Sequence, residues 1–86
     1  HARETAVATA VARAVAGEAN VLTDIAPTMG AEDFSFMLNE RPGAYILIGN
    51  GDSAPVHHPE YNFNDEAITA GCSWWVELIE QGMPAV

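Results

Sequence analysis

The sequence predicts an α/β layer fold whose β-sheet is incomplete within this chain of 86 residues. Apolar side chains recur at helical spacing over residues 2–16 and 65–81, which predicts two amphipathic helices. Between them, residues 44–48 form a short apolar run rich in β-branched and aromatic side chains, and this run predicts a buried strand. Because one strand cannot form a sheet, we expect the missing strands to lie in polypeptide outside the chain.

The N-terminal helix is expected over residues 2–16, where valines recur every four residues from Val7 to Val15. Alanines fill most of the remaining positions, so the helix is narrow. Gly17 is placed to end it as a C-cap. Residues 20–23 are a weaker candidate for a second strand.

A second helix is expected to begin near Gly30 or Ala31 and to end before Pro42. Glu32 and Asp33 would then lie in its first turn. Carboxylates at this position interact favourably with the positive end of the helix dipole.

The last helix is expected to begin at a cap formed by Asn64 or Asp65 and to end at Gly82, with Pro84 following. Its predicted buried stripe consists of Ile68, Cys72, Trp75 and Ile79. The cysteine has two interpretations, a nucleophile or an inert core thiol. Its place on an apolar stripe favours the buried, inert thiol.

The charge of the chain excludes some partners. Twelve acidic residues oppose three basic ones. Nucleic acids and anionic membrane surfaces are bound through cationic groups, so neither is an expected partner. No apolar run approaches the roughly 20 residues that a membrane-spanning helix needs. A single cysteine excludes an internal disulfide and suits a reducing cytoplasm.

A long loop, residues 50–63, joins the predicted strand to the last helix and carries the adjacent His57 and His58. In α/β folds, ligands bind at loops beyond the carboxyl ends of strands, and imidazole is the commonest metal ligand among side chains. The loop is therefore a candidate metal site. Two histidines do not define a zinc site, so a surface loop with two solvated histidines stays equally open at this point.

Glu32 is the second candidate for a functional residue. Together with Gly30 and His58, it is a candidate for contacting substrate or for supporting the groups that hold a metal. The competing interpretation of Glu32 is simple complementarity to the helix dipole, and it is the stronger of the two.

Three stretches of the sequence carry a resemblance to a known family. These stretches are the segment from Pro27-Thr28-Met29-Gly30-Ala31-Glu32-Asp33-Phe34 to Leu38, the strand and turn over residues 43–51, and the run from Val56-His57-His58-Pro59 to Ala67, and they follow one another with the expected gaps. Together with the opening residues 1–6, they resemble the aminoacylase and hippurate hydrolase family of metal-dependent amidohydrolases, which includes plant hydrolases of auxin–amino acid conjugates.

The resemblance implies a zinc-exopeptidase-like catalytic domain, of which residues 1–86 would be the C-terminal segment. The N-terminal half of that domain and a lid domain would lie outside the chain. The parent enzyme would hold two divalent metals per active site (Zn, Mn, Co or Ni), hydrolyse the amide bond of N-acyl amino acids, and form a homo-oligomer through its lid domain.

The same resemblance implies that His57 is a metal ligand and that His58 falls on a position that is not a ligand. The other ligands and the catalytic base would lie upstream, so no catalytic residue is expected within the chain. A catalytic zinc needs about three protein ligands, and we therefore expect the chain alone to be inactive. Two alternatives stay open: a non-catalytic relative that keeps the fold, and an unrelated small acidic α/β module for binding or assembly.

Overall fold

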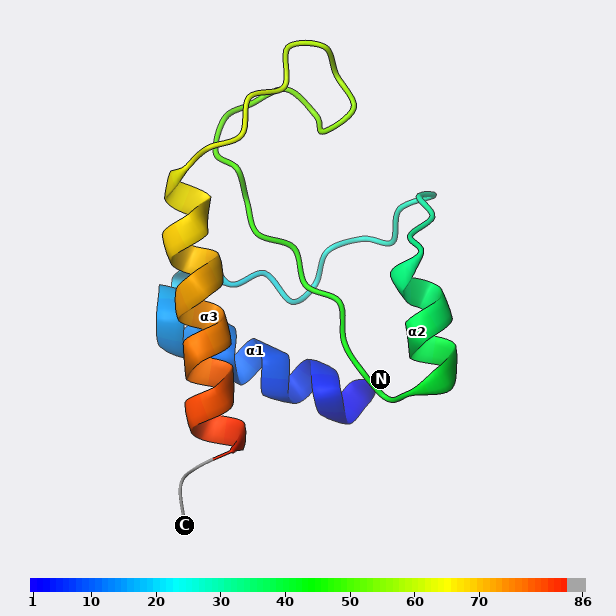
Figure 1. Cartoon of the computed structure of the whole chain (residues 1–86), viewed down its shortest axis with the longest axis vertical. Coiled ribbons are helices and arrows are strands. Elements are labelled where there is room, and N and C mark those ends of the chain that lie inside the picture. Colours follow the sequence, from blue (N-terminus) through cyan, green and yellow to red (C-terminus); the bar gives the residue numbers. More distant parts are fainter. Residues whose placement is uncertain (84–86) are drawn as a thin grey trace.

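The structure of the chain, a computed structural model, describes residues 1–83. Figure 1 shows helices joined by long irregular segments. The helices are α1 (Ala2–Ala16), the short 3₁₀ helix η1 (Glu18–Asn20), α2 (Phe34–Glu40) and α3 (Glu66–Gly82). Within residues 1–83 there is no strand. The prediction of an α/β fold with a partial zinc-exopeptidase-like sheet is therefore wrong for this chain, which is helical.

α1 spans the predicted residues because the features that specify it, the helix propensity of its residues and its C-cap, are local in the sequence. Alanine has the highest intrinsic helix propensity of all residues. Gly17 ends the helix with a φ of 83°, and its N–H donates to the carbonyl of Arg13 at 2.9 Å. A residue with a Cβ rarely adopts this φ, so glycine is required at this point. The predicted helix and its glycine cap are confirmed.

The first predicted strand, residues 20–23, is absent. Asn20 instead closes η1, and its Nδ2 donates to the carbonyl of Ala16 at 2.9 Å. This bond satisfies a carbonyl at the end of α1 that has no partner inside the helix. From residue 21 to residue 32 the chain has no helix or strand.

The second predicted strand, residues 44–48, crosses the molecule as an isolated extended segment (Figure 1). The ring of Tyr45 lies 5.5 Å from the ring of Phe34 in α2, measured between centroids. The side chain of Leu47 is 73% exposed. A strand needs a neighbouring strand to bond its backbone, and no segment within residues 1–83 supplies one. The prediction of a buried strand is wrong for this reason.

α2 begins later than predicted. Two bonds of the tight i to i−3 type precede it, from Ser35 N–H to the carbonyl of Glu32 and from Phe36 N–H to that of Asp33, each 3.0 Å long. Because the chain enters α2 through this tight turn, Glu32 lies before the helix and Asp33 is its N-cap. Their predicted place inside the first turn is wrong.

The small hydrophobic core lies where α1 crosses α3. Ala8 is 5% exposed and Val11 is fully buried, and both belong to α1. The indole Nε1 of Trp74 in α3 donates to the carbonyl of Ala8 at 3.3 Å. The small alanine side chain lets the indole come close enough to the backbone of α1 to make this bond. The crossing is visible in Figure 1.

α3 begins at the predicted position, but it turns a different face inward. Its N-cap residue is Asp65, whose side chain makes no capping bond, and the side chain of Asn64 supplies one instead, because its Oδ1 accepts the N–H of Glu66 at 3.0 Å. The inward residues are half-buried and are Ala67, Gly71, Trp74, Glu77 and Leu78. The predicted buried stripe of Ile68, Cys72, Trp75 and Ile79 is exposed. α1 packs against Trp74 of α3, and this contact determines which face of α3 turns inward. Pro84, predicted to follow the helix, lies outside the described residues.

The described chain is open in shape. Its radius of gyration is 14.4 Å, with extents of 48 × 30 × 21 Å. A compact chain of this length has a radius of gyration of about 12 Å. No helix of residues 1–83 has the length and apolar character that crossing a membrane requires. The described residues bury little of their apolar surface, which leaves large side chains available for further packing.

Candidate functional site

The histidine-bearing loop projects from the end of the extended segment and returns to the start of α3 (Figure 1). Its base is closed by Asn50 and Asn64. The backbone N–H of Asn64 donates to Oδ1 of Asn50 at 2.7 Å, and Nδ2 of Asn64 donates to the carbonyl of Asn50 at 3.4 Å. Both residues are half-buried. We call this pair the asparagine clasp.

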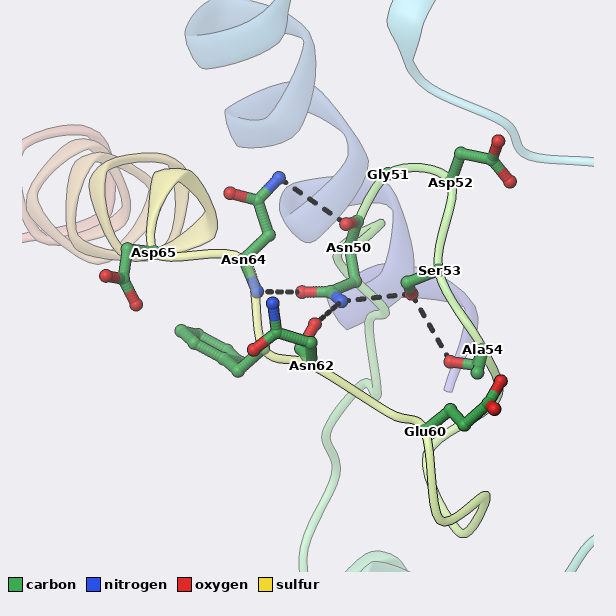
Figure 2. A pocket seen from close by; sticks show the side chains of 10 residues that line it. Asn50, Gly51, Asp52, Ser53, Ala54, Glu60, Asn62, Asn64 and Asp65 are labelled. Carbon is green, nitrogen blue, oxygen red and sulfur yellow. Dashed lines mark hydrogen bonds between the residues drawn. The ribbon is translucent and has the colours of Figure 1, made fainter.

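The side-chain amide of Asn50 makes two further bonds inside the loop, which Figure 2 shows. Its Nδ2 donates to the carbonyl of Asn62 at 2.9 Å and to Oγ of Ser53 at 3.0 Å. Gly51 follows with a φ of 81°, and a Cβ added there would lie 3.5 Å from Nδ2 of Asn64. The positive φ turns the chain into the loop at a position where glycine carries little strain.

Two successive turns set the positions of the histidines. His58 N–H donates to the carbonyl of Pro55 at 2.9 Å, and Tyr61 N–H donates to that of His58 at 3.0 Å. Pro59 follows His58 in the second turn, where its fixed φ suits the geometry. His57 therefore lies inside the first turn, and both histidines are exposed.

The two imidazoles differ in their hydrogen bonding. Nδ1 of His58 accepts the backbone N–H of Glu60 at 3.0 Å. A neutral ring whose Nδ1 accepts carries its proton on Nε2, so this tautomer has no lone pair left for a metal. Within the described residues, no hydrogen bond engages the ring of His57. His57 is thus the histidine of the loop whose ring nitrogen remains available to an external group.

A cavity of about 710 Å³ lies beside the base of the loop. Its size falls within the range of small-molecule sites. Figure 2 shows that its lining comes from the polar residues around the asparagine clasp, with the carboxylates of Asp52, Glu60 and Asp65 at its edge. Neither His57 nor Glu32 lines it. The cavity is accordingly distinct from the predicted site.

The other predicted site residues lie elsewhere. Gly30 and Glu32 are exposed in the segment that leads into α2, which Figure 1 places apart from the histidine loop. Among residues 1–83, no three His, Cys, Asp or Glu side chains gather so that they could hold a metal ion. The described residues therefore do not form a metal site of three or more such ligands by themselves.

Cys72 is exposed on α3, so the prediction of a buried thiol is wrong. The sequence reasoning also missed the asparagine clasp. Its only signals were the Asn50-Gly51 turn and the expected cap at Asn64, and neither signal indicated that the two residues bond each other.

The sequence is similar to several characterised hydrolases. It is 31% identical to hippurate hydrolase of Campylobacter jejuni over 71 residues, which are 83% of this chain and 18% of that protein. It is 36% identical to N-acetyldiaminopimelate deacetylase of Lactococcus lactis over 47 residues, 55% of this chain and 12% of the relative. It is 31% identical to N-acetylcysteine deacetylase of Bacillus subtilis over 49 residues, 57% of this chain and 13% of the relative.

The chain thus spans less than a fifth of the length of these relatives. No solved structure gives a significant match. The family model described as peptidase family M20/M25/M40 matches residues 1–81, which is nearly the whole chain. The chain belongs to the M20/M25/M40 peptidase family.

Proposed function

We propose that the chain is the C-terminal segment of the catalytic domain of a metal-dependent amidohydrolase that acts on N-acyl amino acids. The names of three relatives support the substrate class, because they describe hydrolysis of hippurate and deacetylation of two N-acetyl compounds. In this proposal the lid domain and the N-terminal half of the catalytic domain lie outside residues 1–86, and the lid domain joins subunits of the parent enzyme.

The free imidazole of His57 carries the proposal. It stands in an ordered double turn, it is exposed, and within the described residues it has no hydrogen-bond partner. Nδ1 of the neighbouring His58 instead accepts the N–H of Glu60, and this bond supports the choice of His57 as the proposed ligand. Further ligands must come from outside the described residues, because these contain no cluster that could complete a site.

A divalent metal (Zn, Mn, Co or Ni) bound at such a site polarises the scissile carbonyl and makes bound water more acidic, and the parent would hold two such ions. The described residues of this chain would contribute to that site by holding His57 at a fixed place on the loop. Glu32, Gly30 and His58 are proposed to contact substrate or to support the ligands, in the assembled site.

The exposed apolar surface supports the place of the chain within a larger domain. The side chain of Trp75 is 61% exposed on α3, and that of Leu47 is 73% exposed on the extended segment. Burial of such side chains stabilises a fold by roughly 1.5–3 kcal/mol each, so a free chain would lose a large favourable term. We propose that the remainder of the catalytic domain covers both surfaces.

The test uses the complete protein encoded by the gene, purified without metal and reloaded with Zn²⁺ or Mn²⁺. Hydrolysis of hippurate and of N-acetyl amino acids is measured for the parent sequence and for His57→Ala. We expect the variant to lose at least about 100-fold in kcat/KM and to bind metal more weakly, because removal even of groups that only support a ligand costs about 10–100-fold.

His57→Ala with metal affinity and activity equal to those of the parent would exclude the proposed role. Metal binding without hydrolysis of any N-acyl amino acid would support the non-catalytic relative instead.

A further inference from the structure

We infer that Asn50 is a positioning residue, whose side-chain amide fixes the loop that holds His57. The inference rests on the proposed role of His57 as a ligand. Residues 50 and 64 lie at the two ends of the loop and are 14 positions apart in the chain. The asparagine clasp therefore controls where the histidine between them is placed.

One side-chain amide bonds three groups at the two ends of the loop. Oδ1 of Asn50 accepts from the N–H of Asn64, and its Nδ2 donates to the carbonyl of Asn62 and to Oγ of Ser53. The first two bonds fasten the returning end of the loop, and the third fastens the outgoing end (Figure 2). The double turn around His57 lies between these fixed ends.

The chemistry of the clasp requires an amide and excludes a carboxylate. Asparagine donates and accepts through one planar group, whereas aspartate at neutral pH only accepts. In Asn50→Asp the bond from Asn64 N–H can remain, and the hydroxyl of Ser53 can reverse its direction. The bond to the carbonyl of Asn62 cannot form, because two acceptors would face each other. The substitution therefore removes one of the two bonds that the side chain of Asn50 makes to the returning end of the loop and loosens that end, with almost no change in side-chain volume.

An open loop weakens a metal site even when the ligand itself is unchanged. A productive site holds its groups within roughly 0.5 Å of the required geometry. When the base of the loop is unfastened, the loop must be ordered at the moment of metal binding, and this ordering reduces affinity. A positioning role therefore predicts weaker metal binding together with a more mobile loop in the metal-free protein.

The experiment titrates the complete metal-free protein with Zn²⁺ and measures hydrogen exchange at the amides of His58 and Tyr61, which close the two turns. Asn50→Asp should weaken Zn²⁺ binding about 10–100-fold and speed exchange at both amides. Ser53→Ala, a milder change at the outgoing end, should weaken binding about 2- to 5-fold, since it removes two neutral hydrogen bonds, from Asn50 Nδ2 at 3.0 Å and to the carbonyl of Ala54 at 3.3 Å, and only the first belongs to the clasp.

Asn20→Asp is the matched control. It makes the same chemical change and removes a bond of 2.9 Å to the carbonyl of Ala16, but it lies at the end of α1. We expect Zn²⁺ affinity within about twofold of the parent for this variant, because its loss is confined to one hydrogen bond remote from the loop. Thermal unfolding midpoints of all variants separate a local effect from loss of global stability.

The outcomes separate this inference from the proposed function. If His57→Ala weakens Zn²⁺ binding while Asn50→Asp and Ser53→Ala leave affinity and exchange unchanged, the positioning role is wrong and the ligand role stands. If Asn20→Asp weakens binding as much as Asn50→Asp does, the effect is one of general stability and the positioning role is again wrong. If His57→Ala leaves binding unchanged, the proposed function fails, and the positioning role fails with it.

Discussion

His58 illustrates how a single hydrogen bond separates two neighbouring residues of the same type. Its Nδ1 accepts the N–H of Glu60, two positions further along the chain. An asparagine side chain makes the same kind of bond to a backbone N–H two residues on, and the Asn-Pro sequence favours a turn. The structure therefore calls for a short acceptor at position 58, whereas the proposed ligand role calls for an imidazole at position 57.

This difference predicts distinct results for substitutions at the two positions. His58→Asn should keep Zn²⁺ affinity of the complete protein within about threefold, since the acceptor is retained, whereas His58→Ala loses one hydrogen bond and should weaken it by about 5-fold. Calorimetric titration measures both. A loss of affinity in His58→Asn as large as that in His57→Ala would show that the ring of His58 itself binds the metal.

At the scale of the elements, Gly17 predicts the clearest effect on stability. Its φ of 83° and ψ of 150° belong to a region that is essentially restricted to glycine. Gly17→Ala should destabilise the complete protein by about 1–3 kcal/mol. Denaturant unfolding monitored by circular dichroism measures the change.

Gly82→Ala is the matched control for that prediction. Gly82 is the last residue of α3, its φ is not positive, and an added Cβ would meet nothing within 4 Å. Alanine is a better helix former than glycine, so this variant should be neutral or more stable by up to about 1 kcal/mol. Equal destabilisation by both variants would contradict the assigned role of the backbone at Gly17.

The elements also show what sequence reasoning can and cannot predict. α1 and α3 were predictable because their periodicity and their caps, Gly17 and Asn64, are local. The conformation of residues 44–48 was not predictable in the same way. A strand forms only beside a neighbouring strand, and the described residues contain none. The face of α3 was not predictable either, since the position of α1 decides it and apolar residues occupy both faces.

The same distinction applies to the candidate site. The loop and its histidines were visible as a sequence motif, and the role of His57 stays a prediction. The asparagine clasp joins side chain to backbone across 14 positions. No periodicity reports such a contact, because its two partners are specified only when the loop has closed.

At the scale of the whole molecule, the exposed apolar surfaces predict the behaviour of residues 1–86 in isolation. Large exposed apolar patches promote association. We expect the isolated chain to self-associate at micromolar concentration and to unfold without a sharp cooperative transition. Sedimentation velocity and thermal scans measure these two properties. A cooperative monomer would favour an independent small module over a segment of a larger domain.

A pair of substitutions locates the associating surface. Leu47 and Leu22 are equally exposed, at 73%, but only Leu47 belongs to the extended segment 44–48. A lysine in an exposed apolar segment opposes burial of that segment against another chain. Leu47→Lys should therefore shift the isolated chain towards monomer more than Leu22→Lys does, as measured by sedimentation. Equal shifts would place the association elsewhere.

The junction of Asn50 and Gly51 has a chemical consequence. When the peptide nitrogen of a glycine attacks the side-chain carbon of a preceding asparagine, ammonia leaves, and the cyclic imide then opens with water to aspartate or isoaspartate. While the loop is fastened, three hydrogen bonds restrain that amide against this ageing reaction. Each period of opening exposes the amide to the reaction, and the acidic product can no longer donate to the carbonyl of Asn62 when the loop closes again. Peptide mapping of stored protein would measure the fraction of Asn50 that is deamidated. That fraction would increase with the time that the loop had spent open.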